Sequence, residues 1–190
     1  MKKLRLITIV TVAFELLQAC HSPSNKENTK LADSLNTVKD TTATVGVEKT
    51  DEAFAVEAAR GSMGEIVLGK LAQQKGQDKR VKNFGTMMIN DHAKINKEMK
   101  ALAASKKITL PTAPGNDEQI VIDNLSKKTG KDFDKAFIKD MIEDHKNDIK
   151  AFENASSKCA DPDIKAFAAK LLPIFHNHLD AINTINGSLK

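Results

Sequence analysis

Hydrophobic side chains recur every three or four positions from residue 51 onward, which is the period of an α-helix with one buried face. The pattern predicts four long helices, which begin near Asp51, Asp78, Asp132 and Asp161. Asp51 is placed to cap the first helix and Gly76 to end it, and Pro162 follows the cap of the fourth. Short turns within each pair would make neighbouring helices antiparallel.

The connection between the second and third long helices is longer and contains helix-breaking residues. Pro111, Pro114 and Gly115 interrupt the pattern, and a short helix is predicted over residues 117–126, ahead of Gly130. No segment alternates hydrophobic and polar residues over a useful length, so no β-sheet is expected. Residues 51–190 are therefore predicted to form an all-α four-helix bundle, with a longer central crossover that contains a short helix.

Residues 1–19 have the composition of a bacterial secretory signal peptide. Three basic residues lie among the first five, and residues 6–17 form a mostly apolar run that is too short to cross a bilayer as a helix. The sequence Leu17-Gln18-Ala19-Cys20 is similar to a lipobox, in which the cysteine becomes lipidated. We therefore expect residues 1–19 to be removed and Cys20 to carry a lipid anchor. An ordinary signal peptide with an incidental cysteine is the alternative.

Residues 21–50 are rich in Ser, Thr, Asn, Asp and Lys and show almost no hydrophobic periodicity. Such a composition is typical of a flexible tether, so residues 20–50 are expected to link the lipid anchor to the helical domain. His21 follows the cysteine at the position where Asp favours retention in the inner membrane, which favours an outer-membrane anchor instead. The expected location is the cell envelope, with the domain facing the periplasm.

The composition excludes several classes of function. The 29 basic and 25 acidic residues give a net charge of +4, which falls to +2 without the signal peptide and does not support nucleic-acid binding. Tyr and Trp are absent, and two cysteines are too few for a disulfide framework or a four-cysteine zinc site. Cys159 has no adjacent histidine and no Ser-His-Asp arrangement is evident, so we name no catalytic residue, and the sequence favours a non-enzymatic protein without deciding the question.

Four polar residues occupy positions on the hydrophobic faces, one on each long helix: Glu65, His92, His145 and His178. Counted from the two hairpin turns, at about 1.5 Å per residue, each pair differs in height by roughly one helical turn. A carboxylate and three imidazoles are ligand types of a single zinc, copper, iron or manganese ion. These four residues are therefore predicted metal ligands, whereas His176, two residues from His178, is expected to face solvent.

Two of the histidines belong to an internal repeat. Met88-x-x-Asp91-His92 is echoed by Met141-x-x-Asp144-His145, so each histidine has a methionine one helical turn earlier on the same face. Thioether and imidazole together favour copper(I), which makes Met88 and Met141 candidate soft ligands and copper or zinc the expected metal. The two aspartates lie about 100° around the helix from these faces and are expected to face solvent or to orient neighbouring groups.

An interpretation without metal fits the same pattern. A buried neutral imidazole needs only hydrogen-bond partners, and Glu65 could supply one to a histidine on another helix. A buried polar layer of this kind can fix the register of packed helices. The protein would then be a non-enzymatic structural or interaction domain of the cell envelope, used in maintenance or stress.

The chain resembles a known family at these positions. The first helix is similar to the opening of the bacterial envelope family called domain of unknown function 4142. The similar segment is Phe54-x-x-x-Ala58-Ala59-x-Gly61-x-x-x-Glu65-x-x-Leu68-Gly69-x-Leu71-Ala72. The later segments follow in the family's order: Val81-Lys82-x-Phe84 with Met88-x-x-Asp91-His92, Phe133-Asp134 with Met141-x-x-Asp144-His145, and Leu172-Pro173 with His178-Leu179. The resemblance covers about residues 51–186, with Phe137 where tyrosine is common.

The resemblance implies a ferritin-like fold and agrees with the family's frequent label of outer-membrane protein. The resemblance implies that the four polar residues on the hydrophobic faces are motif positions of the family: Glu65, His92, His145 and His178. It implies no established activity. Ferritin-like di-iron enzymes have Glu-x-x-His on two helices, whereas this chain has Ile89, Ile142 and Phe175 three residues before its histidines. The resemblance therefore implies a mononuclear metal site, or none, rather than a di-iron oxidase.

Overall fold

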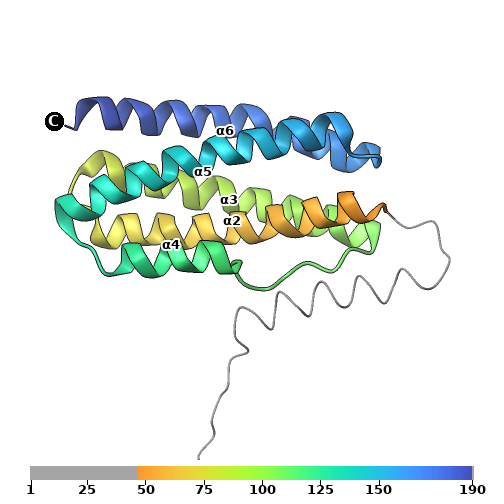
Figure 1. Cartoon of the computed structure of the whole chain (residues 1–190), viewed down its shortest axis with the longest axis horizontal. Helices are drawn as coiled ribbons and strands as arrows, with labels where there is room; N and C mark the ends of the chain where they lie inside the picture. Colours follow the sequence, from red (N-terminus) through yellow and green to blue (C-terminus); the bar gives the residue numbers. More distant parts are fainter. Residues whose placement is uncertain (1–46, 190) are drawn as a thin grey trace, which may run out of the picture.

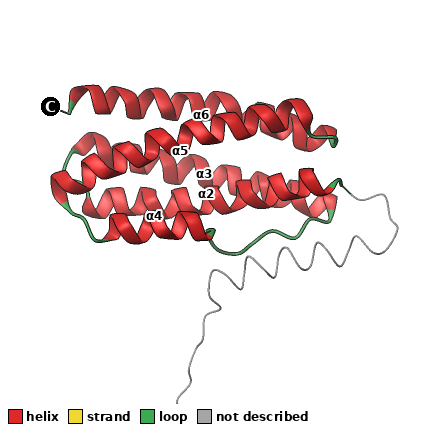
Figure 2. Cartoon of the chain, viewed as in Figure 1, coloured by secondary structure: helices red, strands yellow, loops and turns green. Residues whose placement is uncertain are grey.

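The computed structural model describes residues 47–189, which form five helices and no β-strand (Figures 1 and 2). The helices are α2 (Lys49–Lys75), α3 (Lys79–Lys106), α4 (Asn116–Ser126), α5 (Gly130–Lys158) and α6 (Pro162–Ser188). This confirms the all-α class and the short helix in the central crossover. The predicted signal peptide, Cys20 and most of the tether lie outside the described residues.

The four long helices form two antiparallel hairpins, α2 with α3 and α5 with α6, and α4 packs mainly against α2 (Figure 1). Asp78 caps α3 by accepting a hydrogen bond from the Arg80 backbone N–H at 2.8 Å. Asp161 caps α6 by accepting from two backbone N–H groups of its first turn, with Pro162 at the first helical position. The Asp161 cap agrees with the sequence prediction, and α3 begins next to Asp78, where the pattern placed its start.

Two buried aspartates tie each hairpin to the turn of the other. Asp134 in α5 accepts hydrogen bonds from the backbone N–H groups of Gln77 at 3.0 Å and Asp78 at 2.8 Å, between α2 and α3. Asp51 in α2 accepts one from the backbone N–H of Asp161 at 2.7 Å, between α5 and α6. The prediction that Asp51 caps α2 was wrong, because the helix begins two residues before Asp51. The carboxylate of Asp51 instead accepts a hydrogen bond from the turn between α5 and α6.

Close packing of α2 on α3 depends on two glycines. A Cβ atom on Gly69 would lie 2.7 Å from the carbonyl oxygen of Gly85, and one on Gly85 would lie 2.6 Å from the carbonyl oxygen of Gly69. Neither position can hold a side chain without a shift of the backbone. Gly61 lies on the same helix as Gly69, but a Cβ there would meet no atom within 4 Å.

The core consists of two hydrophobic clusters separated by a polar layer. One cluster contains Ile95, Phe152 and Phe175, and the other contains Leu68, Met88, Phe137, Met141 and Ile182. On each long helix, one of the four predicted polar residues lies between the two clusters and is itself buried. In the part of the chain that the structure describes, no helix combines the length and hydrophobicity needed to cross a bilayer.

Candidate metal centre

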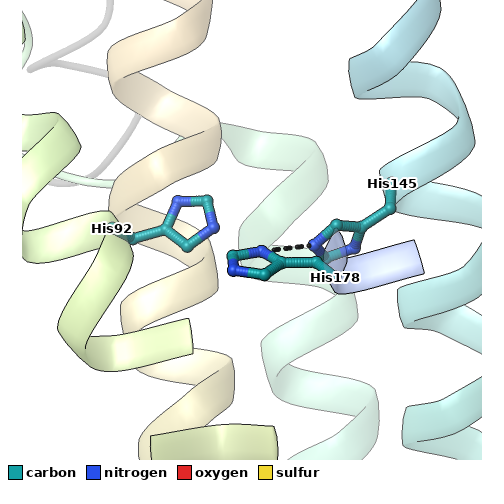
Figure 3. Close-up of side chains that lie close together, drawn as sticks. All are labelled: His92, His145 and His178. Atoms are coloured by element: carbon teal, nitrogen blue, oxygen red, sulfur yellow. Dashed lines mark hydrogen bonds between the residues drawn. The ribbon is translucent and has the colours of Figure 1, made fainter. Parts of the chain in front are cut away.

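Three histidines from three helices meet in the polar layer. His92 on α3, His145 on α5 and His178 on α6 are each 0% exposed, and one ring nitrogen of each lies within 4.8 Å of the others (Figure 3). The rings point toward one another across the gap between the two hairpins (Figure 3). Glu65 on α2 lies beside them and is also buried, so the structure brings all four predicted residues together.

The hydrogen-bond partners of His145 determine where its proton lies. Its Nδ1 is 2.9 Å from the carbonyl oxygen of Met141. A carbonyl oxygen only accepts, so Nδ1 carries the proton and the Nε2 of the neutral ring carries a lone pair. This Nε2 lies 3.2 Å from Nδ1 of His178.

His178 is oriented in the same way by a carboxylate. Its Nε2 lies 3.2 Å from Oδ2 of Asp91 on α3, so Nε2–H donates to the carboxylate and Nδ1 keeps a lone pair in the neutral ring. Partial burial acts to raise the pKa of Asp91, but hydrogen bonds with Lys94 and His178 lower it overall. Asp91 therefore orients a neighbouring imidazole ring, one of the two roles expected from the sequence.

The neutral tautomers place two lone pairs face to face. Nε2 of His145 and Nδ1 of His178 can share a hydrogen bond only if an additional proton lies between them. Two nitrogens bound to one tetrahedral ion at about 2.0–2.1 Å would themselves be about 3.3 Å apart, close to the observed separation. A proton or a metal ion between the two nitrogens would remove the repulsion between their lone pairs.

His92 completes the group with an unpartnered nitrogen. Its Nδ1 lies 2.9 Å from Oε2 of Glu65 and 3.2 Å from Oγ of Ser62. The Ser62 hydroxyl donates to the backbone carbonyl of His92 at 3.4 Å, so Nδ1–H is the donor to both oxygens. Nε2 of His92 then carries a lone pair and makes no hydrogen bond among the described residues, although it is fully buried.

Burial also keeps these rings neutral. It lowers the pKa of His92 to about 4 and, together with the neighbouring His178, that of His145 to about 3. Burial likewise lowers the pKa of His178. Neutral imidazole is the form that binds metal ions, so the three rings do not need to release protons before binding one at neutral pH.

Glu65 lies close to two of the three histidines, His92 and His145. Its Oε2 accepts from His92, and its Oε1 lies 3.6 Å from Nε2 of His145 without forming a hydrogen bond. Burial, followed by the charges of Asp144 and Glu118, raises the pKa of Glu65 well above its ordinary value. This carboxyl group therefore favours a proton or another cation beside it in the folded protein.

The two methionines are buried near the histidines. Met88 and Met141 are 0% and 1% exposed and belong to the same hydrophobic cluster. The polar contact in the structure comes from the backbone carbonyl of Met141, which orients His145, rather than from a sulfur atom. Ligation by either thioether stays a prediction.

Two parts of the site were missed in the sequence. Ser62 lies three residues before Glu65 on α2, a helical spacing that could have indicated a shared face. Glu118 and Asp148 line a cavity beside His92, together with Asp144, and no motif marks them in the sequence. His176 is exposed, as predicted.

A family model matches most of the chain. It is the domain of unknown function 4142 (DUF4142), and the match covers residues 22–185. The chain belongs to this family. The resemblance inferred from the four motif segments is thereby confirmed, and no curated protein matches the chain.

Solved structures share the fold of this DUF4142 member at low sequence identity. A DUF305 fragment from Deinococcus radiodurans has a TM-score of 0.66 at 13% identity and covers 76% of this chain and 99% of its own. CopM in its Cu(I)-bound form has a TM-score of 0.61 at 20% identity, and the match covers 72% of this chain and 95% of the CopM chain. CopM in its Cu(II)-bound form has a TM-score of 0.63 at 18% identity, with coverage of 74% and 97%. At these identities the likeness concerns the fold alone.

Proposed function

We propose that this DUF4142 protein is a cell-envelope lipoprotein whose helical domain binds one transition metal ion, copper in preference to zinc. His92, His145 and His178 would be the ligands, each through the nitrogen opposite its hydrogen-bonded N–H group. The observation that carries the proposal is the 3.2 Å approach of two imidazole nitrogens that both hold lone pairs, beside a third buried nitrogen without a partner.

The donor set and its supports match a metal site. Metal-binding histidines usually donate their second N–H to a carboxylate or a backbone carbonyl, which fixes the ring. Here Glu65, the Met141 carbonyl and Asp91 occupy these positions for the three rings. Glu65 was predicted as a direct ligand; because its Oε2 already accepts from His92, we assign it a positioning role instead.

The preference for copper rests on two supports. Buried imidazoles beside candidate thioethers suit Cu(I), which favours soft and nitrogen ligands. A structural neighbour of the chain, CopM, is known in Cu(I)-bound and Cu(II)-bound forms. A bound ion would join α3 of one hairpin to α5 and α6 of the other, so binding would also stabilise the packing of the two hairpins.

The lipoprotein part of the proposal rests on the sequence around Cys20 and on the polar tether that follows. The same proposal assigns a ferritin-like four-helix bundle to the domain, on the basis of four long helices and a crossover that contains a short helix. Replacing Cys20 with Ser should move the protein from the membrane fraction to the soluble envelope fraction. Equal membrane retention in both forms would contradict the lipid anchor.

Metal binding is tested on the full chain, purified in mild detergent without an affinity tag. We expect one copper ion per chain by elemental mass spectrometry, and stoichiometric Cu(I) uptake in an anaerobic competition titration. His178→Leu should weaken Cu(I) binding by more than about 100-fold, since it removes a direct ligand. His176→Leu is the matched control, because it removes an exposed histidine two residues away on the same helix.

The second candidate function is a structural or interaction domain without metal. It is favoured by the polar pairs that already join helices across the layer, such as Glu65 with His92 and His178 with Asp91. Under this alternative, replacing His92 and His145 with Leu leaves the metal content unchanged and the stability equal or higher. Loss of stoichiometric metal with a retained fold would instead support the metal site.

A further inference from the structure

A partly open cavity of about 180 Å³ lies beside the histidine cluster, and its charged lining is acidic. Its carboxylates come from three helices: Glu57 and Glu65 from α2, Glu118 from α4, and Asp144 and Asp148 from α5. None of the described residues that line it is a lysine or an arginine, although Arg60 on α2 forms an ion pair with Glu57. Like charges gathered in a partly desolvated space repel one another, and a bound cation would remove that repulsion.

The fold brings these carboxylates close together. Asp144 and Asp148 are four residues apart and therefore lie on the same face of α5. Glu118 reaches the cavity because α4 packs against Gly64, where a Cβ atom would lie 2.7 Å from Cγ of Glu118. Only a glycine next to Glu65 leaves room for that approach.

One carboxylate oxygen in this cavity has no donor. The Glu65 side chain is 4% exposed, and its Oε1 makes no hydrogen bond among the described residues. An oxygen of Glu65, one of Asp144 and a ring nitrogen of His145 lie within 4.8 Å of one another. Buried acceptors are nearly always paired in folded proteins, so an unpaired one that faces an acidic cavity indicates a missing positive group.

We propose that this cavity is a second cation site, which takes a divalent cation that prefers oxygen ligands. Glu65 Oε1, Asp144 and Asp148 bind the ion directly, and Glu118 lies at the edge of the site. Several carboxylates with room for water are the ligand set of Mg²⁺, Ca²⁺ and Mn²⁺, whereas the imidazoles next to them suit copper. The site goes beyond the copper proposal and does not require copper to be bound.

Manganese is a suitable probe because free Mn²⁺ gives an electron paramagnetic resonance signal that is lost on binding. We expect the metal-free full chain to bind one Mn²⁺ per chain. Asp148→Asn, which keeps the shape of the side chain, should weaken Mn²⁺ binding at least about tenfold. The control is Glu143→Gln, which removes a carboxylate from an exposed position on the same helix and should leave the affinity unchanged.

A pair of variants separates this site from the copper site. Asp148→Asn should weaken Mn²⁺ binding and keep stoichiometric Cu(I), while His178→Leu should weaken Cu(I) binding and leave the Mn²⁺ affinity unchanged. Circular dichroism melting of each variant verifies that it is folded. Absence of Mn²⁺ binding to the native chain, or equal weakening by Asp148→Asn and Glu143→Gln, would overturn the proposal, even if copper binds as proposed.

Discussion

Asp91 and His178 connect α3 of one hairpin to α6 of the other, through 3.2 Å between the carboxylate Oδ2 and the ring Nε2. The contact fixes the ring so that Nδ1 faces His145. Asp91 is 26% exposed in its side chain, whereas His178 is fully buried, so the pair reaches from the surface to the centre of the polar layer. The Cu(I) affinity of the proposed site is therefore expected to depend on Asp91.

Asp91→Ala should weaken Cu(I) binding by about 10–100-fold without abolishing it, because His178 loses its orienting carboxylate but remains a ligand. The measurement is an anaerobic Cu(I) competition titration. Lys94→Ala is the matched control, since Lys94 forms an ion pair with the same carboxylate at 3.0 Å and lies at the surface. If both variants bind Cu(I) like the native chain, Asp91 has no positioning role.

Asp148→Asn should raise the free energy of unfolding of the metal-free protein at pH 8, by about 1 kcal/mol or more. Burial, then the charges of Glu65, Asp144 and Glu118, raises the pKa of Asp148 well above its ordinary value, so the charged form destabilises the fold. The gain in the free energy of unfolding reaches its full size at pH values above the raised pKa of Asp148 in the folded state. It shrinks as the pH falls below that value and disappears near pH 4, around the unfolded-state pKa.

Chemical denaturation of the native chain and of Asp148→Asn between pH 8 and pH 4 measures this gain. Glu143→Gln, at an exposed position on α5, provides the comparison. A stability difference that stays constant with pH would contradict the electrostatic explanation. The expected result would fit a residue kept for binding at a cost in stability.

Gly69→Ala should lower the free energy of unfolding by about 1–3 kcal/mol, because its Cβ would lie 2.7 Å from the Gly85 carbonyl oxygen and force α2 away from α3. Gly61→Ala, on the same helix with open space around the added atom, should instead raise it by about 0.5–1 kcal/mol through helix propensity. Urea unfolding of both variants gives the comparison. Equal effects at the two positions would show that close helix packing is not the cause.

Asp134→Ala should lower the free energy of unfolding by about 1–3 kcal/mol, because two backbone N–H groups in the turn after α2 lose their acceptor. Asp132→Ala removes an exposed carboxylate two residues earlier and should cost only a few tenths of a kcal/mol. Thermal unfolding measures both. A cost for Asp134→Ala as small as that of the control would mean that the tie between the hairpins contributes little.

Much of the fold could be predicted because helices are encoded locally. The three-to-four-residue period, the Asp78 and Asp161 caps and the break at Gly76 all act within one or two turns of the chain. Polar residues on hydrophobic faces were visible for the same reason, and all four meet in the structure. Asp51 was misassigned because its partner, the backbone of Asp161, is more than a hundred residues away.

The sequence alone determined the helical class, the family and the entry of Glu65 and the three histidines into the core, since periodicity and short motifs depend on neighbouring residues. The tertiary structure decided what those side chains do. The packing of the two hairpins places Asp91 against His178, and the packing of α2 on α3 places Ser62 against His92. Together these contacts set which nitrogens carry lone pairs. The tertiary structure also places Glu118 and Asp148 at one cavity, because charges on separate helices form a site only when the helices meet.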